Sequence, residues 1–183
     1  MINWRVIMTN KFVELTVSEI VELLKSGWSV HRTFIRGDAM LYLDENNNKP
    51  VTSNKFNELN FQGLLEFVDT INGWHPIFHG TVNVYEFNLD ILNKVDYTDL
   101  PLQTVIDLLK NGWKIHSLFT SESALLAPPN NDEKYKLVSE SVMSELRQYG
   151  LNLIEFINYK SHPIFSGDSV YVYEIKQEGE VNE

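Results

Sequence analysis

The chain contains no cysteine among its 183 residues, which excludes disulfide bonds, thiol chemistry and cysteine-ligated zinc. It has no apolar run near the roughly 20 residues that a membrane span needs, and its first residues lack the charged start and long apolar core of a signal peptide. None of its nine glycines belongs to a Walker loop or a Gly-x-Gly-x-x-Gly fingerprint. These absences predict a cytoplasmic protein with no membrane association and no cofactor.

Basic residues are also scarce, with 15 against 25 acidic residues and a formal net charge of −10. The acidic excess is present in both halves of the chain. Sequence-independent binding to nucleic acid depends on cations that neutralise phosphates, so direct binding of this kind is not expected. An acidic surface instead steers the encounter with a basic protein, although a charge of this size also simply keeps a small domain in solution.

The strongest positive feature is an internal repeat. Residues 23–34 return as residues 108–119, with Leu, Leu, Lys, Gly, Trp, His and Phe in the same places, so that Leu23 and Leu108 are 85 positions apart. Downstream, His-Pro-Ile-Phe-His-Gly at 75–80 returns as His-Pro-Ile-Phe-Ser-Gly at 162–167. These two echoes predict a tandem duplication.

The duplication defines the expected domains. We assign the first repeat to residues 1–92, the second to residues 93–176, and an acidic tail to residues 177–183. The chain between the repeats is not a Gly/Ser-rich linker, which favours two packed units, an internal pseudo-dimer, over two separate domains.

Local signals place the expected elements of the first repeat. Thr16 and Glu19 have the spacing of a capping box that begins a helix, and Gly27 ends that helix. A polar loop is expected to run from residue 44 to Pro50. The remaining expectations are strands at 3–9, 28–35, 39–43 and 82–87, a short helix at 54–60, and a segment at 64–71 that is either a strand or a continuation of that helix.

The second repeat is expected to follow the same order. A helix begins at Pro101 and ends at Gly112. Tyr135, Val138, Val142, Leu146 and Tyr149 lie on one side of a helix predicted over residues 132–149. Strands are predicted at 113–119, 124–127, 152–159 and 170–176, the third of which has the same ambiguity as residues 64–71.

Consecutive strands joined by short turns indicate mainly antiparallel sheets and an α+β fold. The repeated unit of about 85 residues has the order α-β-β-α-β(-β), with an additional leading strand as an option. If residues 64–71 and 152–159 are helical, each unit approaches a ferredoxin-like arrangement.

Four of the five histidines are equivalent in the repeat: His31 with His116, and His75 with His162. Trp28, Val30 and Phe34 share one face of their predicted strand, so His31 points to the other, open face, and His116 does the same in its strand. There both histidines either contact a partner or serve as acid/base groups, although a half-exposed structural role is also expected of such residues. No metal site is predicted.

Tyrosines supply the other candidate binding residues. In the strand at 170–176, Tyr171 and Tyr173 lie on one face and valines on the other. Together with His31 and His116, these two tyrosines are the predicted binding residues.

Three functions are compatible with these features. The first is a non-enzymatic module that binds a protein partner, basic or itself nucleic-acid-binding, through an acidic surface. The second is a small metal-independent ribonuclease that uses His31, His116 and Arg32. The third is a structural or immunity-type protein without a catalytic site. A homo-oligomer is compatible with each.

The Asn-, Lys- and Ile-rich, cysteine-free composition of this short chain resembles that of small accessory proteins of phages and bacterial mobile elements. Such proteins often inhibit host defence nucleases, including CRISPR effectors, and some mimic nucleic acid with acidic surfaces. This compositional resemblance implies an anti-CRISPR-like inhibitor of a basic host partner.

Overall fold

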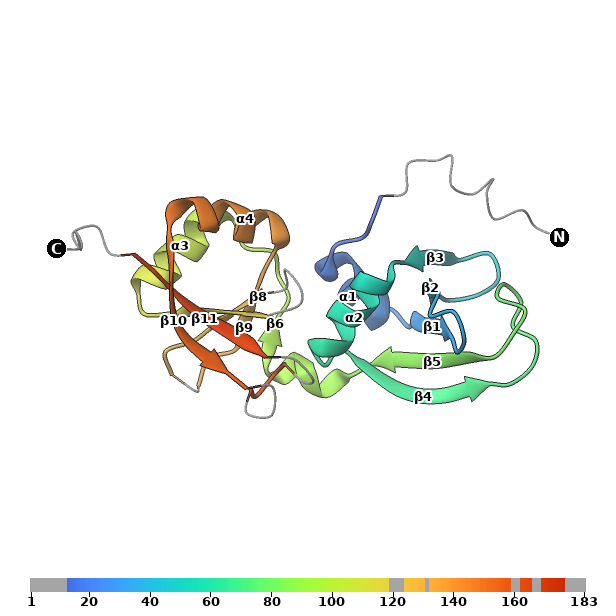
Figure 1. The fold of residues 1–183 in the computed structure, drawn as a ribbon. Coiled ribbons are helices and arrows are strands. Elements are labelled where there is room, and N and C mark those ends of the chain that lie inside the picture. Colours follow the sequence, from blue (N-terminus) through green and yellow to red (C-terminus); the bar gives the residue numbers. More distant parts are fainter. Residues whose placement is uncertain (1–12, 119–123, 131, 159–161, 166–168, 177–183) are drawn as a thin grey trace.

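The computed structural model describes residues 13–118, 124–130, 132–158, 162–165 and 169–176. Within these residues the fold is α+β, with four α-helices and two mainly antiparallel sheets that lie side by side along the chain (Figure 1). Strands from residues 29–87 form one sheet, and strands from residues 95–175 form the other.

The first sheet has the strand order β3-β2-β1-β5-β4, so β3 and β4 are its edges. Its elements in chain order are α1 (Val17–Lys25), β1 (Ser29–Thr33), β2 (Ala39–Tyr42), β3 (Asn48–Val51), α2 (Ser53–Phe61), β4 (Leu65–Ile71) and β5 (Val82–Phe87). A 3-10 helix, η2 (Leu89–Asn93), then leads toward the second sheet.

The second sheet has the order β10-β11-β7-β8-β9-β6. Its elements are β6 (Val95–Asp96), α3 (Leu102–Lys110), β7 (Lys114–Leu118), β8 (Ala124–Ala127), β9 (Tyr135–Val138), α4 (Glu140–Tyr149), β10 (Leu151–Ile157) and β11 (Val170–Ile175). The short strand β6 pairs in parallel with β9, and every other pairing in both sheets is antiparallel.

Several local predictions are confirmed. Thr16 and Glu19 form both hydrogen bonds of the capping box at the start of α1. Gly27 and Gly112 follow α1 and α3 with φ of 94° and 89°, a backbone conformation that glycine adopts without a steric penalty.

The predicted helix over residues 132–149 is wrong in its first part. Tyr135–Val138 forms strand β9, which pairs with β8 on one side and β6 on the other, and α4 begins only after Ser139. Tyr135 and Lys136 pair with β6, and Lys136, Leu137 and Val138 pair with β8, so sheet pairing takes the place of helical hydrogen bonds in this segment. Tyr149, expected on the apolar side of the helix, is exposed.

The polar loop predicted to end at Pro50 is also partly wrong, because Asn48–Val51 forms strand β3. Proline is tolerated there because β3 is an edge strand and its outer side needs no backbone donor. Strand β4 lies within the ambiguous segment at 64–71, and β10 covers residues 152–157 of the other, so the condition for a ferredoxin-like unit is not met. The leading strand expected at 3–9, Phe119 and the tail at 177–183 lie outside the described residues.

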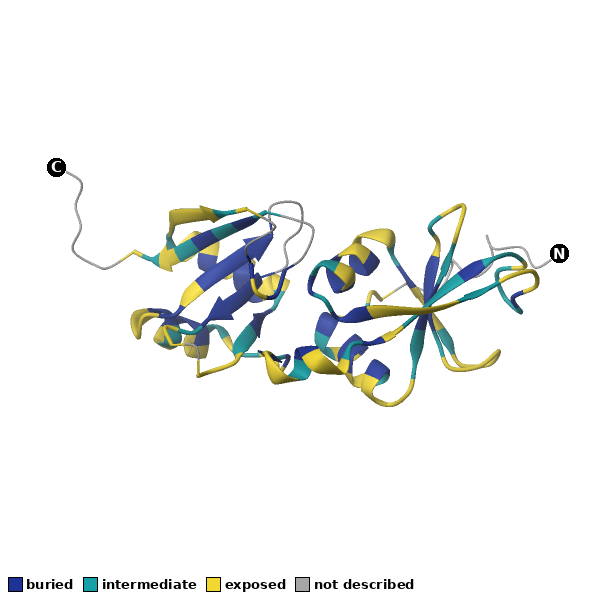
Figure 2. Ribbon diagram, turned by 90° about the horizontal axis from the view of Figure 1, so that it is seen from below, coloured by how far each residue is buried: buried dark blue, intermediate teal, exposed yellow. Residues whose placement is uncertain are grey.

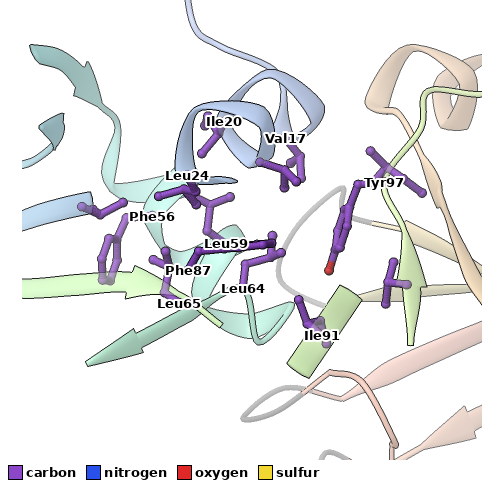
Figure 3. Packing of buried hydrophobic residues seen from close by; sticks show 14 of the residues in the cluster. Val17, Ile20, Leu24, Phe56, Leu59, Leu64, Leu65, Phe87, Ile91 and Tyr97 are labelled. Atoms are coloured by element: carbon purple, nitrogen blue, oxygen red, sulfur yellow. The ribbon is translucent and has the colours of Figure 1, made fainter. Parts of the chain in front are cut away.

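Apolar side chains form two clusters, and buried positions run through both sheets and the inner sides of the helices (Figure 2). The smaller cluster joins α3 and α4 to one face of the second sheet and includes Trp113. The larger cluster extends from α1 and α2 to the second sheet. Val17, Leu64 and Ile91 lie on its side toward Tyr97, which follows β6 (Figure 3). A continuous apolar core therefore connects the two sheets.

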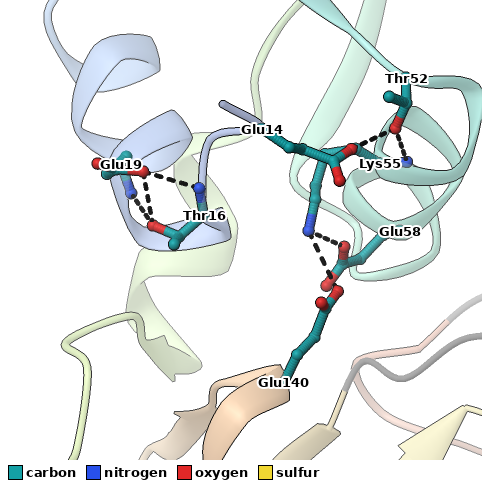
Figure 4. Close-up of polar contacts among 7 residues, drawn as sticks. All are labelled: Glu14, Thr16, Glu19, Thr52, Lys55, Glu58 and Glu140. Carbon is teal, nitrogen blue, oxygen red and sulfur yellow. Dashed lines mark hydrogen bonds and ion pairs between the residues drawn. The ribbon is translucent and has the colours of Figure 1, made fainter. Parts of the chain in front are cut away.

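Polar contacts also cross between the two halves (Figure 4). Lys55 of α2 is buried, and its Nζ lies 2.6 Å from Oε2 of Glu58 and 3.4 Å from Oε1 of Glu140 in α4. Burial alone lowers the pKa of Lys55, but the hydrogen bond and charge of Glu58, together with Glu140, outweigh it and raise this pKa. The Ser18 hydroxyl donates to the Tyr97 carbonyl oxygen at 2.8 Å. The halves are thus joined by polar as well as apolar contacts.

Candidate functional site

His31 in β1 faces His75, which lies in the connection between β4 and β5. Nδ1 of His31 is 2.8 Å from Nε2 of His75, and both residues are buried. The Tyr42 ring stacks on His31 with ring centroids 4.4 Å apart. The connection is thereby fastened to the sheet face opposite the helices.

The hydrogen-bond partners fix the protonation of this pair. The backbone N–H groups of Ile77 and Phe78 donate to Nδ1 of His75, each at 3.2 Å. This nitrogen therefore carries no proton, and the proton of His75 is on Nε2, from which it is donated to His31. His31 in turn has its proton on Nε2, which lies 3.0 Å from Oγ of Ser29. Both imidazoles are neutral in this arrangement.

His116 and His162 repeat the pair in the second half. Nδ1 of His116 lies 2.7 Å from Nε2 of His162. Nδ1 of His162 accepts the backbone N–H groups of Ile164 and Phe165, at 3.1 and 2.9 Å. The same reasoning makes this pair neutral. Lys114 occupies the position that corresponds to Ser29 in the first half.

Electrostatics agree with the neutral pairs. Burial, reinforced by the neighbouring His75, lowers the pKa of His31 to about 4. Burial, reinforced by Lys114, lowers the pKa of His116 to about 4. Burial and the neighbouring His116 lower the pKa of His162 to about 3, and burial, with a smaller effect of His79, lowers the pKa of His75.

These positions differ from the open-face histidines that the sequence predicts. His31 and His116 are only 5% and 9% exposed, and each is hydrogen-bonded to a second buried histidine, His75 or His162. They lie in different sheets, and each bonds to a histidine of its own half. The guanidinium of Arg32 lies instead over the Phe56 ring, 4.2 Å from its centroid. The structure does not bring His31, His116 and Arg32 together.

Sequence reasoning missed the partners of these histidines. His75 and His162 are the hydrogen-bond partners of His31 and His116. The signal that points to them is the joint repetition of both histidine positions in the two halves. Phe34, expected on the buried face of its strand, is exposed because β1 ends at Thr33.

Edge strands β4 and β10 each expose several apolar side chains. Phe67 and Val68 are exposed on β4, and Leu153, Ile154 and Phe156 are exposed on β10. The register of each strand shifts at an equivalent place, between Phe67 and Asp69 and between Leu153 and Glu155. The outer side of an edge strand has unpaired backbone N–H and C=O groups, to which a strand of another chain can pair. Exposed apolar side chains on such an edge add contact area for that chain.

The predicted binding residues Tyr171 and Tyr173 lie on β11, next to β10. Tyr171 is directly opposite Phe156, with ring centroids 5.4 Å apart, and Tyr173 is opposite Leu153. Both tyrosines are half-buried. Tyr171, Tyr173, Leu153, Ile154 and Phe156 together form what we call the β10 surface.

Comparison with protein-family models, curated proteins and solved structures found no match. Among the described residues, no three histidine, aspartate or glutamate side chains are grouped so as to hold a metal ion. No helix in the same part of the chain has the length and apolarity to cross a membrane. The histidine pairs and the two strand edges are therefore the features of this protein that bear on its function.

Proposed function

We propose that the protein is a non-enzymatic binding module that engages a basic protein partner, with the β10 surface as its main contact. The observation that carries the proposal is the exposure of Leu153, Ile154 and Phe156 on an edge strand, beside two half-buried tyrosines. Aromatic and apolar anchors of this kind dominate the energetics of protein interfaces. The net charge of −10 favours a partner of opposite charge.

The histidine pairs favour a binding function over the ribonuclease alternative. A general acid or base must reach its substrate in the appropriate protonation state. Both nitrogens of His75 and of His162 have hydrogen-bond partners within the protein. The two histidines that the ribonuclease would use are buried and lie in separate sheets. Their role in this proposal is to fasten a connection onto each sheet.

The proposal includes a tandem duplication packed as an internal pseudo-dimer. Five strands of each sheet follow one order, since β3-β2-β1-β5-β4 corresponds to β9-β8-β7-β11-β10. The equivalent bulges and the two histidine pairs also support a common origin. Duplication yields two related edges on one molecule, and the protein then acts as an inhibitor that occupies a basic surface of its partner, such as a host defence nuclease.

Capture from a bacterial lysate by the immobilised protein tests this function. We expect a discrete basic protein to be retained at low salt and released at high salt. The double substitution Leu153→Ser with Phe156→Ser should abolish retention. Phe34→Ser with Ile35→Ser removes exposed apolar groups from a turn of the first half and serves as the matched control. Equal retention by all three proteins would reject the β10 surface, and cleavage of RNA by the purified chain would favour the ribonuclease.

A further inference from the structure

We propose that edge strand β4 is a strand-addition site for an extended segment in which basic and apolar residues alternate. The proposal deepens the proposed function by specifying the partner chemistry, and it rests on that function. β4 is the last strand of its sheet and lies along its outer side (Figure 1). Its four central residues, Glu66 to Asp69, are all exposed.

The two faces of this edge differ in chemistry. Glu66 is directly opposite Glu86, and Asp69 follows on the same face, opposite Val84. Phe67 is opposite Tyr85 on the other face, with ring centroids 5.8 Å apart, and Tyr85 contacts Phe56 of α2. Because side chains alternate along a strand, an added strand places its odd and even residues on these two faces. One face therefore fits basic side chains, and the other fits apolar ones.

The carboxylates on this edge have no cationic partner within the described part of the chain. Glu66, Glu86 and Asp69 form no ion pair among the described residues. Like charges directly opposite each other on neighbouring strands are destabilising. A lysine or arginine from an added strand relieves this repulsion while its backbone pairs with β4. The unpaired carboxylates thus indicate the charge of the occupant.

The equivalent edge in the second half lacks this feature. Asn152 of β10 corresponds to Glu66, and it is opposite Glu174, which corresponds to Glu86. The two halves therefore differ at this position: the β4 edge has a like-charged pair, and the β10 edge has a neutral residue opposite an acidic one. We infer that β4 selects a basic segment by charge, whereas β10 contributes apolar contact.

A second copy of the chain does not fit the β4 edge. Pairing two β4 strands brings Glu66 and Asp69 toward the same residues of the other copy, and these charges repel. The bulge at Val68 also interrupts the pairing register, which limits any added strand to a short paired stretch on either side. Both features suppress self-association but leave room for a short basic segment.

The test uses the full chain and a labelled peptide of alternating lysine and valine, matched to the seven residues of β4. Fluorescence anisotropy measures affinity, and amide hydrogen exchange locates the contact. We expect saturable, salt-sensitive binding that protects amides of β4. Glu66→Asn, which copies the residue of β10, should weaken binding about tenfold, whereas Glu174→Gln on the second sheet should leave it unchanged.

One control peptide separates strand addition from general attraction between opposite charges. A peptide with N-methylated backbone nitrogens has the same charge but cannot donate backbone hydrogen bonds, and it should not bind. Equal binding by this peptide, equal weakening by Glu174→Gln, or no saturable binding would each overturn the proposal. Lysate capture that depends on Leu153 and Phe156 would still support the proposed function in that event, so the two failures are distinguishable.

Discussion

Nε2 of His75 donates a hydrogen bond to Nδ1 of His31 across 2.8 Å, and this contact joins residues 44 positions apart in the chain. Nδ1 of His75 accepts hydrogen bonds from two backbone N–H groups, so the ring proton is on Nε2. His75 is therefore the donor in the bond to His31. Protonation of either ring would place two donors against each other. The pair is therefore compatible with the fold only while it is neutral.

We predict that the protein loses stability as the pH falls from about 6.5 toward 4. The pKa values of His31 and His116 are about 4 in the folded protein and about 6.5 when unfolded. In this window the unfolded chain binds protons that the folded chain does not, so lower pH favours unfolding. Each such histidine lowers the unfolding free energy by up to about 1.4 kcal/mol per pH unit.

Urea denaturation at several pH values measures this effect. Asp96, whose pKa is lowered in the folded protein, weakens the fold only at lower pH, since its ordinary pKa of 3.8 lies below the window. An unfolding free energy that stays constant between about pH 7 and 5 would contradict neutral histidine pairs.

We predict that His75→Ala lowers the unfolding free energy by about 1–3 kcal/mol, because it removes the donor to His31 and the acceptor of two backbone N–H groups. His79→Asn is the matched control, since His79 is exposed and has φ of 53°, a conformation that asparagine tolerates. Its effect should stay within about 0.5 kcal/mol. Thermal and chemical denaturation at neutral pH compare the two, and equal effects would mean that the hydrogen-bonded pair contributes nothing specific.

How far the sequence predicts this structure depends on the range of the interactions involved. Thr16, Glu19 and Gly27 act within one helical turn, so the start and end of α1 follow from local pattern. Strand β9 was missed because Tyr135 and Val138 fit a helical spacing, and only pairing with the distant β6 and β8 makes them a strand. The histidine pairs depend on contacts over 44 and 46 residues, which no local pattern contains.

We predict that Lys55→Ala is strongly destabilising, by roughly 3–5 kcal/mol, because it leaves Glu58 buried without its cation. Glu140→Ala removes the other partner of Lys55, but the Glu140 side chain is 56% exposed, so the cost should be below about 1 kcal/mol. The double substitution Lys55→Met with Glu58→Leu should recover most of the stability lost in Lys55→Ala. Denaturant midpoints give all three values, and failure of the double variant to recover would show that the ion pair fixes the local packing.

We predict that Gln62→Met raises the unfolding free energy by about 1 kcal/mol. Gln62 is fully buried after α2, and neither its side-chain oxygen nor its side-chain nitrogen has a hydrogen-bond partner among the described residues. Methionine has a similar shape and needs no hydrogen-bond partner. Destabilisation would instead reveal a polar molecule bound to the amide, and thermal unfolding of the two proteins at equal concentration decides between these outcomes.

Exchanging Glu66 and Asn152 between the two edges should change stability in opposite directions. Glu66→Asn removes the like-charged pair with Glu86 and should stabilise the free protein by about 0.2–1 kcal/mol at low salt. Asn152→Glu creates the same pair with Glu174 and should destabilise by a similar amount. High salt should reduce both effects, because these carboxylates are exposed.

Glu66→Asn is also expected to weaken binding of the lysine–valine peptide. The same substitution would therefore raise the stability of the free protein and lower its affinity for the peptide. If Glu66→Asn lowered both the unfolding free energy and the affinity for the peptide, the carboxylate would stabilise β4 rather than recognise a partner.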